Sequence, residues 1–429
     1  LNSTNFGGDP NMRFEKVSST ILETVHSNHS LSSYLTNLYT KGREATPRSW
    51  FYENVPIETL LKEVRAMYTE ANKGPYEELF NQVEESNLEK FGPQGKVPPV
   101  KHSKAWDECL DPIFCSSAFD DEGKLAEFFP YTKEFAKYLF GSRLMTKRRK
   151  SFERVIDDMQ DRDTLNTNSG YPRFTERNSV VVNEIADAKS GKAFDYPAIL
   201  LGRHYHGKLR PVWMYPMSMN LLEYQFSQVI QDVLRQSSNP NVRRHLSPWE
   251  GYEDVKKTLT LKWLPGMHIL GGDTTKMDAH MRKAQIRLFY EITKWLFQRQ
   301  EWDQWYRVCM RVCSIELLID TDKWLNTDHG LASGSGITQL SETVLVMFIL
   351  WMNGILESQG IGDDFYAITD NDGEWLVRTL DKYGLPAKPE KQTDSSEYLD
   401  FLQRRNVQGF FSSEFQQILG GYYSIIRAL

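Results

Sequence analysis

Cysteine is scarce in this chain, which contains four in 429 residues. Cys309 and Cys313 stand four positions apart in an apolar segment that we predict to be helical. We interpret them as two core thiols on one helix face rather than as metal ligands. So few cysteines indicate a reducing, intracellular setting.

An apolar leader and a membrane-spanning run are missing as well. Residues 1–16 are polar, so no targeting sequence is evident there. The longest apolar run, Thr343–Leu356, is shorter than the roughly 20 residues that cross a bilayer. We therefore expect a buried helix and no membrane partner. Because Leu1 is not a methionine and 24 residues follow Arg405, we expect a chain that is trimmed at both ends.

An excess of basic charge is also absent, since the net charge is −6. This balance argues against a surface coated with cations for duplex RNA. It does not exclude a protein that keeps its basic residues inside a channel. The basic run Lys147–Lys150 is interpreted as a solvated helix face, with the rim of a channel as the alternative.

The composition that is present, 40% apolar and 13% aromatic, is sufficient for a large core. Alternation of strands and helices from residue 263 onward predicts an α+β (mixed α/β) fold and not an all-β one. We predict strands at Met267–Leu270 and Phe365–Thr369. The predicted helices are Ile57–Ala71, Lys283–Phe297, much of Trp302–Cys313, Thr338–Leu356 and Glu374–Tyr383.

Three short motifs follow one another in the second half of the chain. They are Asp273–Asp278, Ser333–Thr338 and Gly362–Asp364. Each is weak alone, because a single Gly-Asp-Asp is most often an ordinary turn. In this order, with an apolar helix between the second and third, they indicate the palm of a template-directed nucleotide polymerase.

Aspartates dominate the first and third motifs. Nucleotidyl transfer uses two divalent ions about 4 Å apart, and such hard cations prefer oxygen ligands. We expect Asp273, at a strand end, and Asp363, at a hairpin tip, to bind two Mg²⁺ or Mn²⁺ ions, with Asp364 as an auxiliary ligand. Gly362 would supply the positive φ of a tight hairpin. Asp278 would accept a hydrogen bond from a ribose 2′-hydroxyl, the group that distinguishes RNA from DNA.

The second motif is a glycine-rich loop, Ser333–Gly336, before a predicted helix. The hydroxyl and amide groups of Ser333 and Gly334 would contact the template and the nascent base pair. Thr338, on the first helical turn, would reach the incoming ribose. The alternative is a plain helix cap with flanking glycines.

Upstream, Arg203, Lys208 and Arg210 place three cations within eight residues. Alternation along a strand would put Lys208 and Arg210 on one face. They would neutralise an incoming triphosphate. The alternative is a charged surface hairpin.

These motifs resemble those of the viral RNA-dependent RNA polymerases, whose seven motifs occur in a fixed order. The resemblance covers roughly residues 165–405, and all seven motifs are present in family order. Within the group, the chain is most similar to polymerases of double-stranded RNA viruses of the picobirnavirus type, with a partitivirus-like enzyme as the nearest alternative. The matched segments not described above are the template segment Thr167–Pro172, the basic segment Lys208–Trp213, Gly384–Gln392 and Phe401–Arg404.

The resemblance implies a right hand of fingers, palm and thumb, with the palm built on an RRM-like antiparallel sheet plus helices. Residues 1–100 would be an N-terminal extension that bridges fingers and thumb. The remaining expected divisions are fingers at 101–262, palm at 263–405 with a fingers insertion at about 283–328, and the start of a truncated thumb at 406–429.

The resemblance also implies roles for residues outside the three motifs. Lys391, with Lys388 in reserve, would protonate the leaving pyrophosphate as general acid. The template segment would guide RNA, and the Phe401–Arg404 turn would support the primer end. The residues expected to contact template or primer are Thr167, Ser169, Gly170, Tyr171, Pro172, Phe401 and Arg404.

The function implied is RNA-templated RNA synthesis that replicates and transcribes a double-stranded RNA virus genome. The partners would be the RNA template and nascent strand, ribonucleoside triphosphates and the viral capsid protein. The enzyme would act as a monomer inside the virus particle, in the host cytoplasm. A reverse transcriptase, an inactive RNA-binding scaffold and a palm-type nucleotidyl cyclase are the alternatives. Asp278 argues against a reverse transcriptase, and the aspartates expected to bind metal argue against an inactive scaffold. The template segment argues against a cyclase.

The chain departs from the family pattern at two internal places. Glu342 stands where an asparagine is usual, and its role is open, because a second carboxylate near Asp278 repels it unless a proton or a donor intervenes. If the apolar helix runs through Leu356, only Glu357–Ile361 remain to turn and form a strand, which by itself takes about 5 residues. We therefore expect that residues are absent between Leu356 and Gly360.

Overall fold

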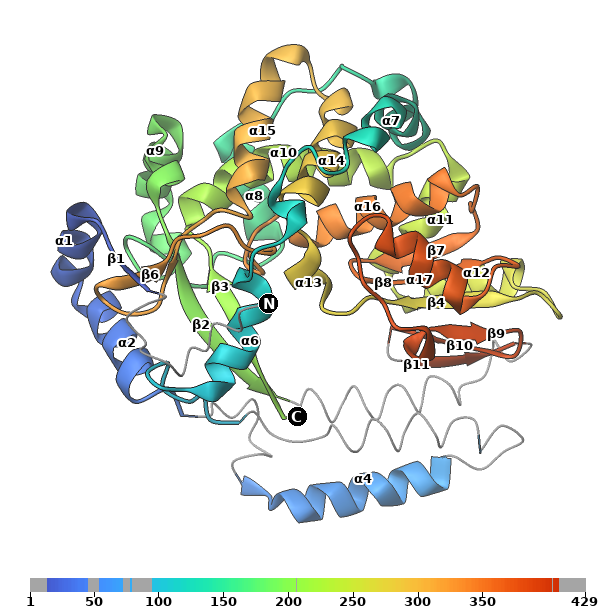
Figure 1. Ribbon diagram of the computed structural model, residues 1–429, viewed down its shortest axis with the longest axis horizontal. Helices are drawn as coiled ribbons and strands as arrows, with labels where there is room; N and C mark the ends of the chain where they lie inside the picture. Colours follow the sequence, from blue (N-terminus) through green and yellow to red (C-terminus); the bar gives the residue numbers. More distant parts are fainter. Residues whose placement is uncertain are drawn as a thin grey trace.

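The computed structural model describes residues 14–44, 54–71, 78, 95–205, 207–402 and 404–408. These residues form a five-stranded sheet, a four-stranded sheet and a two-stranded hairpin among many helices, which confirms the predicted α+β class. In Figure 1 the five-stranded sheet lies on the left and the four-stranded sheet on the right, with helices across the top between them. The expected thumb, 406–429, lies almost entirely outside the described residues.

The four-stranded sheet is antiparallel throughout, in the order β7-β8-β4-β9, as expected of the predicted palm sheet. Its central strand carries two glycines before Asp273. A Cβ on Gly272 would lie 2.2 Å from the Phe365 ring, so only glycine lets the neighbouring strand pack there. The strands are β7 (Ser358–Ile361), β8 (Asp364–Ile368), β4 (Ile269–Asp273) and β9 (Thr393–Ser395).

The five-stranded sheet has the order β1-β6-β5-β2-β3 and is built around the long β2–β3 hairpin. Helices α1 (Ser19–Ser27) and α2 (His29–Thr40) cover it with apolar side chains that pack against Ile199 and Leu318. The strands are β1 (Glu15–Lys16), β6 (Lys323–Leu325), β5 (Leu317–Leu318), β2 (Ala198–Tyr205) and β3 (Lys208–Met214).

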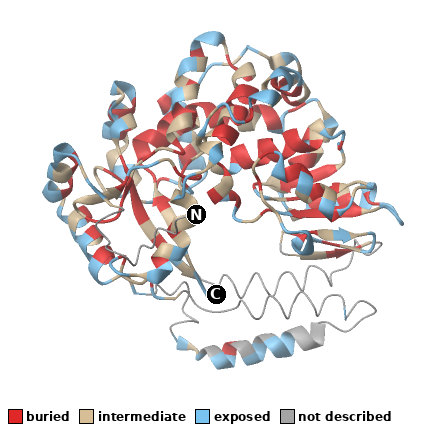
Figure 2. Cartoon of the chain, in the orientation of Figure 1, coloured by how far each residue is buried: buried red, intermediate tan, exposed pale blue. Residues whose placement is uncertain are grey.

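One large core joins the two sheets. It is formed mainly by α10 (Met217–Arg235), α14 (Lys283–Thr293), α15 (Trp302–Arg311) and α16 (Thr338–Met352), and Figure 2 shows buried residues concentrated along these helices. Cys309 and Cys313 are buried in this core, which confirms their interpretation as core thiols. They do not share a helix face as predicted, because α15 ends at Arg311 and Cys313 lies in the turn that follows. No helix in the described part of the chain has both the length and the apolarity needed to cross a membrane.

The other described elements flank this core or the sheets. Helix α4 runs below both sheets in the view of Figure 1. These elements are α4 (Ile57–Ala71), α6 (Lys104–Phe114), α7 (Thr132–Phe140), α8 (Phe152–Asp161), α9 (Val181–Ser190), α11 (Pro240–His245), α12 (Tyr252–Lys262), α13 (Met277–His280), α17 (Gly373–Asp381), β10 (Tyr398–Phe401) and β11 (Arg404–Val407).

The apolar helix ends earlier than predicted, which removes the reason for expecting absent residues between Leu356 and Gly360. Helix α16 stops at Met352 because Gly354 adopts a left-handed φ of +72°, a common helix ending. The segment 353–357 then makes the turn, and β7 begins at Ser358. The connection is long enough, so the geometric reason for expecting absent residues before Gly360 does not hold.

The basic run Lys147–Lys150 is not a helix face as predicted. Its backbone bonds to other segments instead of to itself: Lys147 N donates to Leu296 O at 3.1 Å, and Lys150 N donates to Gln225 O at 2.9 Å. The Lys150 ammonium also pairs with Asp232 at 2.8 Å. The run is therefore an extended segment that is tied to α10 and to the residues after α14.

Candidate active site

The strand β4 and the hairpin β7–β8 bring the predicted carboxylates to one end of the four-stranded sheet. Asp273, the last residue of β4, is the register partner of Asp364. Gly362 and Asp363 form the two-residue turn, and Gly362 has φ +58°, which confirms the expected positive value. The Gly362 amide donates to Thr343 Oγ1 at 2.9 Å, which holds the hairpin tip against α16.

Asp363 and Asp364 have raised pKa values, in part because these carboxylates repel one another. Burial raises the pKa of Asp364 to about 7, and the charges of Asp363 and Asp273 act in the same direction. The Leu402 amide, which donates to Asp364 Oδ2 at 3.0 Å, opposes this shift. Burial, followed by the charge of Asp278, raises the pKa of Asp363.

A bound divalent cation would relieve such repulsion. The carboxylate oxygens are also the ligands that Mg²⁺ and Mn²⁺ prefer. Among the described residues, however, no three or more His, Cys, Asp or Glu side chains already form a group that could hold a metal ion. The carboxylates are thus placed at neighbouring backbone positions without a closed cage, and their metal role stays a prediction.

Glu342, the residue with an open role, forms a side-chain hydrogen bond with Asp278. Burial, followed by the charges of Asp278 and Asp363, raises the pKa of Glu342 well above its usual value. The raised pKa favours the protonated form of Glu342, which would relieve the repulsion expected of two neighbouring carboxylates. Glu342 also lies beside the hairpin tip, because a Cβ on Gly362 would be 3.1 Å from Glu342 Oε2.

A cavity of about 780 Å³ opens between β3 and the segment after β4. This volume is in the range of small-molecule sites. It brings together six predicted residues: Arg203, Lys208, Arg210, Asp278, Ser333 and Asp363. Glu108 and Cys109 of α6 also line it and were not predicted, because α6 carries no recognisable motif. Lys276 lines it too; it lies inside the first motif, but its position there indicated no role.

The glycine-rich loop packs against β3. Ser333 Oγ accepts a hydrogen bond from Trp213 N at 3.2 Å, and a Cβ on Gly334 would lie 1.9 Å from Trp213 O. Glycine is therefore required for this close approach. Thr338 Oγ1, expected to reach a ribose, donates to Ala332 O at 2.9 Å, so the hydroxyl closes the loop at the start of α16.

The template segment is largely buried. Ser169 is 0% exposed, and Tyr171 is 2% exposed with its ring centroid 5.1 Å from that of Tyr196. Thr167 is exposed and Pro172 is half-buried. Ser169 and Tyr171 thus have structural side chains, and RNA could meet this segment only through Thr167, Asn168, Pro172 and exposed backbone.

The turn after β10, like the template segment, includes a residue that was expected to contact RNA but has a buried side chain. Phe401 is 1% exposed and its ring lies 5.1 Å from that of Tyr366, so its side chain belongs to the core. The Arg404 guanidinium lies 3.9 Å from the Tyr252 ring centroid. Because Leu402 also binds Asp364, this turn is attached directly to the carboxylate edge.

The segment expected to supply the general acid lies beside Asp273. Lys388 and Lys391 are both exposed. The Gln392 side chain accepts from Asp273 N at 2.8 Å and donates to Asp273 O at 2.7 Å. Gln392 therefore positions the strand end that carries the first aspartate, a role that the sequence did not indicate.

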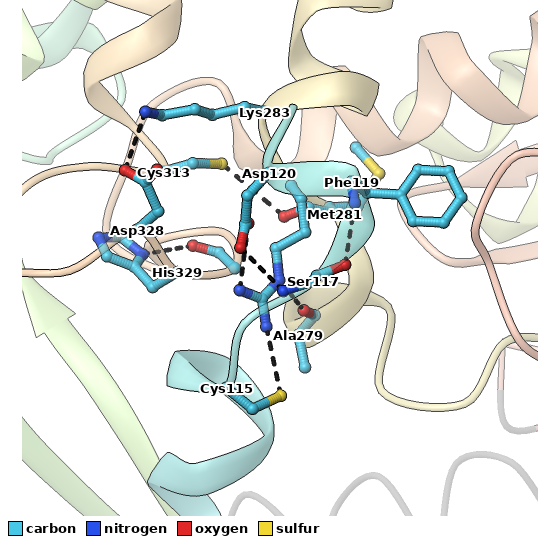
Figure 3. Close-up of polar contacts among 12 residues, drawn as sticks. Cys115, Ser117, Phe119, Asp120, Ala279, Met281, Lys283, Cys313, Asp328 and His329 are labelled. Atoms are coloured by element: carbon cyan, nitrogen blue, oxygen red, sulfur yellow. Dashed lines mark hydrogen bonds and ion pairs between the residues drawn. The ribbon is translucent and has the colours of Figure 1, made fainter. Parts of the chain in front are cut away.

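A buried arginine fixes the segment that follows Asp278. Arg282 Nε donates to Ala279 O at 2.8 Å, and its guanidinium pairs with Asp120 at 3.4 Å. In Figure 3, Asp120, Cys115 and the Ala279 carbonyl lie around one guanidinium group, which is that of Arg282. The short helix that carries Asp278 is thereby tied to the chain that follows α6.

The basic hairpin β2–β3 thus lines the same cavity as Asp278, which follows β4, and Asp363, on the β7–β8 turn. No protein-family model matches the chain. It is 24% identical over 435 residues to a potential RNA-dependent RNA polymerase of a human picobirnavirus (strain Human/Thailand/Hy005102/-), which covers 94% of this chain and 76% of that protein.

Solved structures give the same result for the fold. The crystal structure of the RNA-dependent RNA polymerase of a human picobirnavirus matches with a TM-score of 0.71 at 20% identity, over 94% of this chain and 79% of that one. Its insertion loop deletion mutant matches with a TM-score of 0.72 at 20% identity, over 94% and 81% of the two chains. The predicted resemblance to picobirnavirus polymerases is therefore confirmed in sequence and in fold.

Proposed function

We propose that this chain is an RNA-dependent RNA polymerase that adds ribonucleotides to a nascent strand on an RNA template. The observation that carries the proposal is the cavity in which Arg203, Lys208 and Arg210 face Asp278 and Asp363. Its size suits a nucleotide, and its two walls carry the opposite charges that a triphosphate and its metal ions require. The similarity to picobirnavirus polymerases supports the same conclusion.

Each wall of the cavity has a proposed task. The guanidinium and ammonium groups of Arg203, Lys208 and Arg210 bind the triphosphate and offset the charge that develops on the leaving pyrophosphate. Asp273 and Asp363, with Asp364 beside them, would hold two Mg²⁺ or Mn²⁺ ions. When bound, these ions would supply activation of the primer 3′-oxygen and neutralisation of the phosphate charge.

The remaining proposed tasks concern selection and proton transfer. Asp278, positioned beside Glu342, accepts a hydrogen bond from the ribose 2′-hydroxyl. Ser333 and Gly334 lie under the nascent base pair. Lys391 protonates the pyrophosphate, with Lys388 in reserve. We further propose that the enzyme replicates and transcribes a double-stranded RNA virus genome as a monomer, in contact with the capsid protein inside the particle.

The test is incorporation of labelled ribonucleotides on a single-stranded RNA template with Mg²⁺ or Mn²⁺, comparing the parent with Asp363→Ala. We expect template-length product from the parent and none from the variant. Equal product from both would show that the hairpin assignment is wrong. A parallel reaction with deoxyribonucleotides tests the reverse transcriptase alternative, which predicts equal or better incorporation of the deoxy substrates.

A further inference from the structure

Glu223 lies in the second turn of α10, is 0% exposed, and directs its carboxyl group into the glycine-rich loop. Ser335 Oγ donates to Glu223 Oε2, and the Gly336 amide donates to Glu223 Oε1 at 2.9 Å. Asn220 Nδ2 donates to the same Oε1 at 3.0 Å. A wholly buried carboxyl group is costly unless such partners satisfy it. Here two of its three donors belong to the loop.

Asn220 extends these bonds toward the template segment. Its Nδ2 also donates to Gly334 O at 3.2 Å, and its Oδ1 accepts from Arg177 Nη2 at 3.0 Å. Arg177 in turn donates from Nε to Asn168 O at 3.2 Å and from its backbone N to Thr167 O at 2.9 Å. A continuous chain of hydrogen bonds therefore runs from the glycine-rich loop to the template segment.

The packing of the loop makes its position sensitive to these bonds. A Cβ on Gly336 would lie 2.3 Å from the Tyr224 ring, on the α10 side of the loop. The opposite side rests on the Trp213 carbonyl, as described above for Gly334. The loop backbone is thus enclosed by α10 and β3. Glycines have little intrinsic preference for one conformation, so contacts with neighbours must define it.

We propose that Glu223 is a positioning residue that, with Asn220 and Arg177, holds the glycine-rich loop and the template segment together as one template-binding unit. The inference rests on the proposed polymerase function, because it assigns template contact to these two segments. Glu223 itself does not line the cavity and acts through the loop. Burial raises the pKa of Glu223 to about 7, while the three donors act against this shift.

The deciding variants are Glu223→Met, which fills the space without a comparable acceptor, and Glu223→Gln, which keeps an acceptor for the Gly336 amide. Asn220→Ala breaks the link to Arg177 while Glu223 stays in place. The matched control is Glu301→Met, since Glu301 is also buried and instead binds Arg149. Binding of a fluorescent single-stranded RNA by the full chain is measured by anisotropy without nucleotides, and thermal unfolding is followed in parallel.

We expect Glu223→Met and Asn220→Ala to weaken RNA binding about tenfold, the effect of losing one strong hydrogen bond. Glu223→Gln should restore binding, and Glu301→Met should lower the melting temperature without changing RNA binding. In extension reactions the template KM should rise by a larger factor than the nucleotide KM, because only Ser333 of the loop lines the nucleotide cavity. A general loss of packing would not produce this split between the two substrates.

Unchanged RNA binding by folded Glu223→Met and Asn220→Ala would overturn the inference. If Glu223→Met does not fold, Asn220→Ala decides by the same measurement. A parent that binds RNA but makes no product would contradict the polymerase proposal, while the binding comparison would still decide the role of Glu223. A parent that binds no RNA would contradict both.

Discussion

At Glu223, burial and hydrogen bonding act in opposite directions on one carboxyl group, and burial prevails. The pKa rises from 4.5 to about 7 on folding. Between these values the folded chain keeps a proton that the unfolded chain has lost. This group therefore stabilises the fold fully below pH 4.5, and its contribution is lost as the pH rises to about 7.

Glu223→Gln cannot titrate, so it should lack this part of the pH dependence. Urea unfolding of the parent and of the variant at pH 5 and pH 8 measures the difference. We expect the parent to lose about 2–3 kcal/mol more unfolding free energy than the variant between these values. Parallel losses in the two proteins would mean that Glu223 is ionised throughout the range.

Single residues also show what the sequence could and could not predict about the site. Asp273 and Asp363 were identified because their motifs are local and ordered along the chain. Gln392 and Glu223 were not, because their partners lie more than one hundred positions away in the sequence. Tyr171 and Phe401 were expected at the RNA surface, yet both are buried, since a motif gives the residue type and not the direction of its side chain.

The presence of the helices and strands was predicted more accurately than their lengths. The bounds of α4 and the start of α16 agree with prediction, because amphipathic or apolar patterns mark them. The end of α16 was placed too late because apolar residues continue past Met352 while the backbone reverses at Gly354. Hydrophobicity could not reveal this stop, which depends on a backbone conformation that glycine permits.

The hairpin β7–β8 allows a test of how closely activity depends on turn geometry. Gly362→Ala should lower stability by about 1–2 kcal/mol, because an alanine at φ +58° is strained. Its Cβ would also lie 3.1 Å from Glu342 Oε2, which would displace Asp363. We therefore expect a large loss of kcat in ribonucleotide incorporation.

Gly354→Ala is the matched control for this hairpin variant. Its φ is +72°, but an added Cβ would meet nothing within 4 Å. It should lose similar stability and keep parental activity. Full activity of Gly362→Ala, with the expected loss of stability, would show that the hairpin tip tolerates displacement.

The net charge of the whole molecule is −6, yet Arg203, Lys208 and Arg210 are gathered at the cavity, where they can attract a triphosphate locally. The cations of β3 belong to one sheet and Asp363 belongs to the β7–β8 turn of the other, with the cavity between them. A single core of helices fixes the two sheets relative to each other. The distance between the two sheets could not be predicted, because each sheet is assembled from segments that are far apart along the chain.

The carboxylate edge therefore carries repulsion that the fold tolerates and that a divalent cation would relieve. Asp363→Asn removes one of the repelling charges, so without metal its melting temperature should equal or exceed that of the parent. With Mg²⁺ or Mn²⁺ the order should reverse, because binding to the folded parent adds about 1–3 kcal/mol when the ion is well above its Kd.

Thermal unfolding of both proteins with and without each ion, at one ionic strength and one scan rate, measures this reversal. Constant ionic strength is necessary because added salt also screens the charges of the cavity and the surface. Equal metal stabilisation of the parent and of Asp363→Asn would place the ion elsewhere. A variant less stable than the parent even without metal would show that the Asp363 carboxylate is held by attraction, with the Arg210 charge outweighing the carboxylates around it.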